Sequence, residues 1–157
     1  MPQLLNTVVE ALKESEEQGR QALESMIELT NVHSEIWKNN TNQLVNVVSQ
    51  VILQKTFENG TRASAVEVVL ALSQSMPASL RKVDETRTMF FPALVQMLTE
   101  VEEDLTVWSE TQEEENNTDP YNTAVQAINR ISEDLGGKTI MATATGLIQQ
   151  LVKSSQW

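Results

Sequence analysis

The sequence predicts an all-α fold in which antiparallel helix pairs stack into an α-α superhelix. Apolar residues recur at helical spacing along most of the chain, while glycine (5 residues) and proline (4 residues) are too scarce for a fold built on many turns. A similar helical segment also recurs 43 residues apart, at positions 22 and 65, within the roughly 40–47 residues of HEAT and armadillo units. The expected architecture is therefore a HEAT/armadillo-like solenoid of about 3.5 helix pairs.

The recurring segment has an alanine, an apolar residue, an acid or amide, and then further apolar positions. It occurs at 22–29, 65–72 and 124–131. The second interval is 59 residues, which is 16 more than the first, and it contains a strongly acidic stretch. A helix with a wide apolar face precedes each copy, as expected for the first helix (A) of a stacked pair whose second helix (B) is the recurring segment.

These patterns predict A and B helices in alternation at about 2–13, 16–31, 34–55, 60–75, 78–104, 120–135 and 138–154. Pro92 predicts a bend in the fifth helix. Asp119 and Pro120 have the residue types of an N-cap and first helical position. Gly136-Gly137 predicts a left-handed C-cap.

The corresponding repeats are about 1–33, 34–77 and 78–136, with a half repeat at 137–157. The last helix is apolar at Leu147, Ile148, Leu151 and Val152 and has no B partner. Repeat arrays need polar terminal caps. We therefore expect the chain to be one solenoid fragment from a longer array.

Charge and composition exclude several function classes. The net charge of −11 disfavours nucleic acid and anionic membranes as partners, because both bind clustered Lys and Arg. No apolar run approaches the roughly 20 residues that span a bilayer. The chain has no cysteine and one histidine, His33. Gly136-Gly137-Lys138-Thr139 lacks the upstream glycine of a phosphate loop. The sequence predicts no enzyme, metal or cofactor site.

The segment from 100 to 119 is the strongest local feature. It holds nine of the chain's 22 carboxylates and no Lys or Arg. One interpretation is a solvated loop whose like charges prevent folding. The other is a docking loop for a basic surface, with Trp108 as an aromatic anchor. The D-x-D-x-D-G spacing of a calcium loop is absent. The candidate binding residues here are Glu102, Glu103, Asp104, Trp108, Glu110, Glu113, Glu114 and Glu115.

The B helices offer a second candidate surface. With Ala22, Met26 and Leu29 in the core, the 100° step per residue places Gln21, Glu24, Ser25 and Glu28 on the opposite side. The equivalent positions are Ser64, Glu67, Val68 and Ala71 in the second B helix, and Thr123, Gln126, Ala127 and Arg130 in the third. Either these residues form a solvated face, or they line a groove whose candidate contacts are Glu24, Glu28, Glu67 and Gln126. Arg20 and Arg62 share one repeat position and are expected to bond neighbouring loops.

Several stretches occur in an order and spacing that resembles one family, the importin-beta-3 karyopherins. They are Arg62–Ser73, Pro77–Lys82, Phe91–Leu98, Glu100–Asp104 with Trp108, Ala127–Ile131, Leu135–Lys138 and Gln156–Trp157. The resemblance covers roughly residues 40–157, and the first 40 residues fit only as a generic helix pair.

The resemblance implies the central part of a nuclear import receptor that moves between cytoplasm and nucleus. It implies basic cargo with nuclear localisation signals, Ran-GTP and possible nucleoporin contacts as partners. Cargo would bind the concave B-helix face near Glu67, and Ran-GTP or cargo would bind the acidic loop. The alternative is a HEAT-repeat scaffold or adaptor of another class, such as an assembly or phosphatase-type scaffold.

Overall fold

The architecture is a stack of paired helices in two columns. The computed structural model describes residues 2–100 and 119–153, and no strand occurs in these ranges. The helices are α1 (Pro2–Glu14), α2 (Glu16–His33), α3 (Thr41–Leu53), α4 (Asn59–Ser75), α5 (Pro77–Leu80), α6 (Phe91–Leu98), α8 (Pro120–Leu135) and α9 (Gly137–Lys153). Two single turns, η1 (Ser34–Trp37) and η2 (Thr86–Phe90), complete the described elements.

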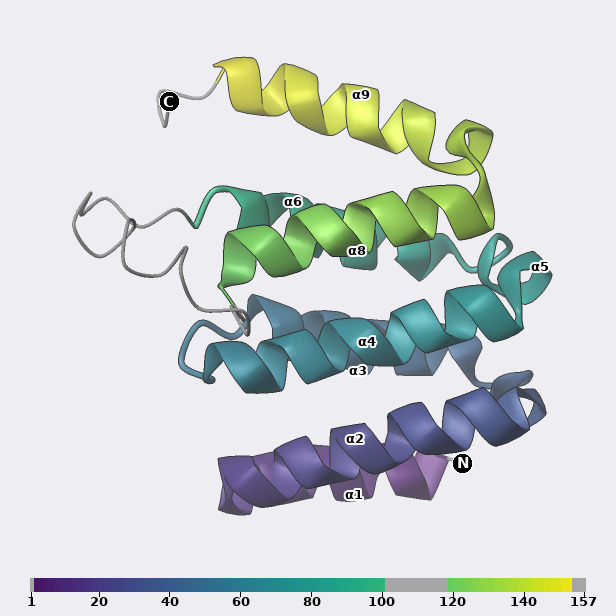
Figure 1. Cartoon of the computed structure of the whole chain (residues 1–157), viewed down its shortest axis with the longest axis vertical. Coiled ribbons are helices and arrows are strands. Elements are labelled where there is room, and N and C mark those ends of the chain that lie inside the picture. The colour runs from purple at the N-terminus through teal and green to yellow at the C-terminus, as the bar shows by residue number, and fades with distance from the viewer. Residues whose placement is uncertain (1, 101–118, 154–157) are drawn as a thin grey trace.

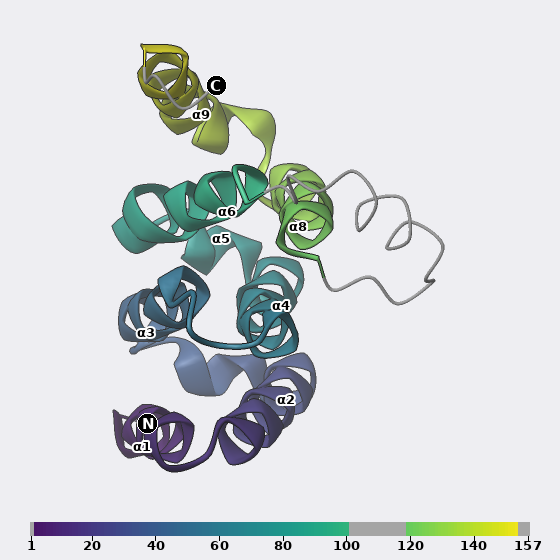
Figure 2. The same ribbon diagram turned by 90° about the vertical axis from the view of Figure 1, so that its left-hand side faces the viewer.

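The predicted all-helical solenoid is confirmed. Figure 2 shows α1, α3, α6 and α9 in one column and α2, α4 and α8 in the other, and Figure 1 shows these long helices in successive layers from α1 to α9. Each B helix contacts its own A helix, and α4 also contacts α2 on one side and α8 on the other. One continuous apolar core therefore runs through the stack.

The first pair shows why the helices can approach closely. Leu5, Val8 and Leu12 form the buried stripe of α1, at the spacing of one helical face. Gly19 of α2 packs against that stripe, and a β-carbon on Gly19 would lie 2.8 Å from the Cα of Leu12. The absence of a side chain at Gly19 thus sets the distance between α1 and α2.

The predicted helix over 34–55 begins later than expected. Residues 34–37 form the 3₁₀ turn η1, and α3 starts at Thr41. The indole of Trp37 is fully buried, and its Nε1 donates a hydrogen bond of 2.9 Å to the Thr30 hydroxyl in α2. This contact turns the chain back onto α2 before α3 begins, a tertiary effect that the local apolar pattern does not contain.

The prediction of one bent helix over 78–104 is wrong. The chain forms the short helix α5, a turn, the π-helical turn η2 and then α6, which ends at Leu98. The N–H of Phe91 bonds the carbonyl of Thr86, five residues earlier. Pro92 has no N–H and its ring would clash with the carbonyl four residues before it. The wider π turn just ahead of Pro92 accommodates the ring.

The ends of α8 are set locally. Asp119 caps the helix as predicted, because its Oδ2 accepts the Asn122 N–H at 3.1 Å and Pro120 follows it. Gly136 has the expected positive φ of 81°, but its ψ of 142° is extended, so the predicted left-handed C-cap is wrong. The extended ψ directs the chain into α9.

No helix in residues 2–100 and 119–153 is long and apolar enough to cross a membrane.

Candidate partner-binding surface

The outer face of α2 carries the exposed acidic residues that the sequence predicted. Gln21, Glu24, Ser25 and Glu28 are all exposed there. Glu24 makes only a long contact of 3.8 Å with Arg20 on its own helix. Within the described part of the chain, Glu28 has no ion-pair partner. These two carboxylates are therefore available to a positively charged ligand.

The same face does not continue unchanged along α4. Val68 and Ala71, which were predicted to line the groove, are buried. These two side chains are buried because α4 is packed by α2, α3 and α8 together, whereas α2 is covered on fewer sides. Ala127 of α8 is buried for the same reason, while Gln126 is exposed as expected.

Glu67 of α4 is already paired within the chain. Its two carboxylate oxygens accept hydrogen bonds of 2.7 and 2.8 Å from the Arg130 guanidinium of α8. These hydrogen bonds, with the charges of Glu67 and Asp134, raise the pKa of Arg130 above its ordinary value although burial opposes the shift. Both side chains remain more than one third exposed. A basic ligand at Glu67 would have to compete with Arg130.

Arg62 lies at the start of α4 and joins three segments. Its side chain is 3% exposed, its Nε donates to the Ile52 carbonyl at 2.7 Å, and its two terminal nitrogens donate to Glu100 at 2.7 and 3.0 Å. Lys55 adds a contact of 3.4 Å to Glu100. The expectation that Arg62 bonds neighbouring loops is thus correct.

These contacts change the ionisation of Glu100. Burial alone would raise its pKa, but the hydrogen bonds and charge of Arg62, with the charge of Lys55, outweigh burial and hold the pKa below its ordinary value of 4.5. Glu100 therefore stays ionised and fixes the point at which the acidic segment leaves α6. Nothing in the local sequence distinguishes Glu100 from the other carboxylates of that segment, because its partner Arg62 lies 38 residues earlier.

Only the two ends of the acidic segment, Glu100 and Asp119, are among the described residues. Glu102, Glu103, Asp104, Trp108, Glu110, Glu113, Glu114 and Glu115 lie outside the described residues, and their role as partner contacts stays a prediction. Both described ends have structural roles, as the partner of Arg62 and as the cap of α8.

On the opposite edge, Arg81 after α5 fastens the end of α8. Its Nε donates to the Leu135 carbonyl at 2.8 Å and its Nη2 donates to the Asp134 carbonyl at 2.9 Å. The Ser73 hydroxyl donates to the Asp134 carboxylate. The guanidinium groups of Arg62, Arg81 and Arg130 therefore each make side-chain bonds across the stack, and Ser73 adds another. The repeat pattern suggested loop contacts for Arg20 and Arg62, but Arg20 contacts Glu24 on its own helix instead. It suggested none for Arg81 and Arg130.

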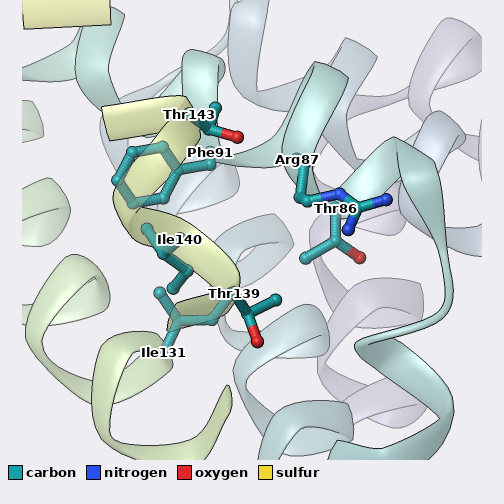
Figure 3. Close-up of a pocket in the computed structure, with 7 residues that line it drawn as sticks. All are labelled: Thr86, Arg87, Phe91, Ile131, Thr139, Ile140 and Thr143. Carbon is teal, nitrogen blue, oxygen red and sulfur yellow. The ribbon is translucent and has the colours of Figure 1, made fainter. Parts of the chain in front are cut away.

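The described residues contain no group of three or more His, Cys, Asp or Glu side chains arranged to hold a metal ion. Figure 3 shows a small gap where Phe91, Ile131 and Ile140 meet between α6, α8 and α9. It leaves no room for a water-sized molecule, so it is a packing gap and not a ligand site. His33 is exposed and pairs with Glu35 at 3.2 Å.

The chain is similar to known proteins in both sequence and structure. A family model described as an importin repeat matches residues 54–142. Importin subunit beta-3 of Saccharomyces cerevisiae is 27% identical over 164 residues, which cover 100% of this chain and 15% of that protein. The structure of Kap121p bound to RanGTP has a TM-score of 0.85 and 24% identity, and that of Kap121p bound to Pho4p has a TM-score of 0.87 and 25% identity.

Each of these two matches covers 99% of this chain and 16% of Kap121p. The chain thus spans less than a fifth of the relatives that it matches. The importin-repeat model covers more than half of the chain. The chain belongs to the importin-repeat family, and it is a segment like those of importin-beta-3 karyopherins, which are transport receptors rather than enzymes.

Proposed function

We propose that this chain is a partner-binding segment of a nuclear import receptor, which takes basic cargo signals on its B-helix face and Ran-GTP on its acidic segment. The observation that carries the proposal is the pair of exposed carboxylates on α2. Among the described residues Glu28 has no ion-pair partner, and Glu24 has only a contact of 3.8 Å with Arg20. Kap121p, a structural relative, has been crystallised with Pho4p and with RanGTP.

The charges divide the B-helix face into two parts. On α2, Glu28 is unpaired among the described residues and Glu24 has only the long contact with Arg20. On α4, Glu67 already accepts two hydrogen bonds from Arg130. A lysine or arginine of a ligand gains more binding free energy at a carboxylate that is bound only by water than at one that is already paired with another cation. We therefore assign the larger share of the cargo affinity to Glu24 and Glu28.

The acidic segment between α6 and α8 is the proposed contact for Ran-GTP or cargo. Its charge would raise the rate of association with a basic surface. A nucleoporin contact is a further part of the proposal, supported by a matched structure of Kap121p bound to Nup53p. We also propose the repeat division at 1–33, 34–77, 78–136 and 137–157, and a distribution between cytoplasm and nucleus.

Calorimetry on the chain with a lysine-rich signal peptide and with Ran-GTP, each at two salt concentrations, tests the proposal. We expect binding that weakens as salt rises, because exposed charge pairs are screened. A double substitution, Glu24→Gln with Glu28→Gln, should weaken peptide binding by about tenfold, which corresponds to about 1.4 kcal/mol.

The matched control is Glu10→Gln with Glu14→Gln. Both residues are exposed on α1, in the other column, and the change in net charge is the same. We expect this control to retain the affinity for the peptide. Equal losses in the two double variants would show that only net charge matters and would refute the assignment to α2. No binding of either partner, also in a longer chain with both flanks restored, would refute the function.

A further inference from the structure

Asn59 is the only asparagine of the sequence that a glycine follows. In an Asn-Gly pair the asparagine side chain loses ammonia most readily, because glycine has no β-carbon to hinder the attack of its own backbone nitrogen on the asparagine Cγ. Folding normally suppresses this reaction, since hydrogen bonds and packing hold the nitrogen away from the side chain. The surroundings of Asn59 and Gly60 therefore determine whether the reaction occurs in the folded chain.

The first turn of α4 has no side-chain cap. Asn59 is the first residue of the helix, and the side chain of Glu58, the N-cap residue, makes no capping hydrogen bond. The Arg62 N–H bonds the Glu58 carbonyl at 3.1 Å. Within the described part of the chain the Gly60 N–H has no hydrogen-bond partner, as in any uncapped first turn. The nitrogen that would attack Asn59 is therefore not held by a hydrogen bond.

Neighbouring side chains do not shield the two reacting groups. The Asn59 side chain is exposed and makes no hydrogen bond to the described residues. A β-carbon added to Gly60 would come within 4 Å only of the Arg20 Nη1, at 3.5 Å, which is ordinary van der Waals contact. Opening of the first turn therefore breaks no hydrogen bond of the Asn59 amide or of the Gly60 N–H.

The start of α8 has the opposite arrangement. Its N-cap residue, Asp119, accepts the Asn122 N–H on its Oδ2 at 3.1 Å. The next residue, Thr123, donates its N–H to the Asp119 carbonyl at 3.0 Å. Asn122 thus lies in a capped turn in which the following backbone nitrogen is bonded, whereas Asn59 lies in an uncapped turn in which it is not. The two helix starts allow a comparison within one chain.

We propose that Asn59 is a site of spontaneous deamidation in the folded chain. The Gly60 nitrogen gives its proton to solvent base and forms a bond to the Asn59 Cγ. The bond from Cγ to the side-chain nitrogen breaks, and that nitrogen takes a proton from solvent and leaves as ammonia. Water then opens the resulting succinimide ring at one of its two carbonyls. The product is either aspartate at position 59 or an isoaspartyl linkage, in which the main chain runs through the former side chain.

Both products change the start of α4. Each adds one negative charge to the net charge of −11. The isoaspartyl form also lengthens the main chain by one carbon just before Arg62, which is held by its bonds to the Ile52 carbonyl and to Glu100. Because these bonds keep Arg62 in place, we expect the first turn of α4 to open in the isoaspartyl form and the helix to begin later.

Incubation of the chain in mildly alkaline buffer, followed by digestion and mass spectrometry, tests the proposal. We expect Asn59 to react faster than any other asparagine, at a rate within about tenfold of that in a free peptide of residues 55–63, since fraying of a helix end costs little free energy. The rate should rise with pH, because the attacking nitrogen must lose its proton. Labelling by an isoaspartyl methyltransferase distinguishes the two products. A folded chain that keeps Asn59 intact while the peptide reacts would overturn the proposal.

Two variants and one control test the role of the uncapped turn. Gly60→Ala should stop the fast reaction, and the fold tolerates it because the added carbon makes only an ordinary contact. Glu58→Ser should slow the reaction about fivefold, because a serine cap stabilises the first turn by about 1 kcal/mol. Thr123→Gly is the control that places a glycine after Asn122 in the capped turn, where we expect a much slower reaction than at Asn59. Equal rates at these two asparagines, or an unchanged rate in Glu58→Ser with helical circular dichroism intact, would overturn the assignment.

Discussion

Arg62 is the residue whose loss should cost this fold most among its charged side chains. Substitution by methionine removes its bonds to Ile52 and Glu100 and leaves a half-buried carboxylate without its guanidinium partner. We expect Arg62→Met to lower the free energy of unfolding by about 3 kcal/mol, as for a broken buried ion pair. Urea denaturation followed by circular dichroism measures the change.

Arg20 supplies the matched control, because it holds the same repeat position but is partly exposed and makes only a long contact with Glu24. Arg20→Met should change the free energy of unfolding by no more than about 0.5 kcal/mol, as for an ordinary surface substitution. Similar costs for the two variants would contradict the role given to the Arg62 contacts.

The same contacts make stability depend on pH. The pKa of Glu100 is lowered in the folded chain, because Arg62 and Lys55 outweigh its burial. A lowered folded-state pKa means stability that is present above the unfolded-state value of about 4.5 and is lost as the pH falls through the folded-state pKa. The difference in free energy of unfolding between the unmodified chain and Glu100→Gln should be constant near neutral pH and shrink below about 4.5. A difference that grows on acidification would contradict this sign.

At the scale of single helices, the spacing between α1 and α2 depends on Gly19. An alanine there would place its β-carbon 2.3 Å from the Cδ2 of Leu12 and 2.8 Å from its Cα, so the helices would have to move apart. We expect Gly19→Ala to lower the free energy of unfolding by about 1–3 kcal/mol. Thermal unfolding followed by circular dichroism measures the effect.

Gly146 of α9 is the control for that substitution. It also lies inside a helix, but a β-carbon there would meet nothing within 4 Å. Gly146→Ala should therefore stabilise the chain by about 0.5–1 kcal/mol, since alanine is the better helix former. If both alanine variants were stabilising, the close approach at Gly19 would not limit the α1–α2 distance.

The sequence predicted helix boundaries well where residues next to the boundary determine it. The bounds of α8 follow from Asp119, Pro120 and Gly136, which act on the residues next to them. The helices expected over 34–55 and 78–104 were misjudged where distant contacts or backbone chemistry intervene. Trp37 bonds back to Thr30, and the π turn ahead of Pro92 needs a hydrogen-bond pattern that apolar periodicity does not encode.

Across the whole molecule, the repeat spacing predicted the two columns of helices, but it could not predict which side chains pair between repeats. Periodicity placed Glu67 and Arg130 on one face without indicating that they bind each other, because their contact joins residues 63 apart. It also treated all three B helices alike. In the stack, α4 is covered on more sides than α2, so Val68 and Ala71 are core residues and the acidic face is concentrated on α2.

The Glu67–Arg130 pair therefore allows a test of the B-helix face as a unit. If basic peptides bind along this face, Arg130 competes with them for Glu67. Removing the charge of Arg130 should then raise the affinity of the chain for the peptide. We expect Arg130→Gln to tighten binding of a lysine-rich peptide about threefold and to lower the free energy of unfolding by only about 0.5–1 kcal/mol, since the pair is partly exposed. Glu67→Gln should weaken binding, because it leaves the Arg130 cation unpaired on the face. Calorimetry on both variants measures the two effects. An unchanged affinity in Arg130→Gln would show that peptides do not reach α4, and a loss of affinity would contradict the competition for Glu67.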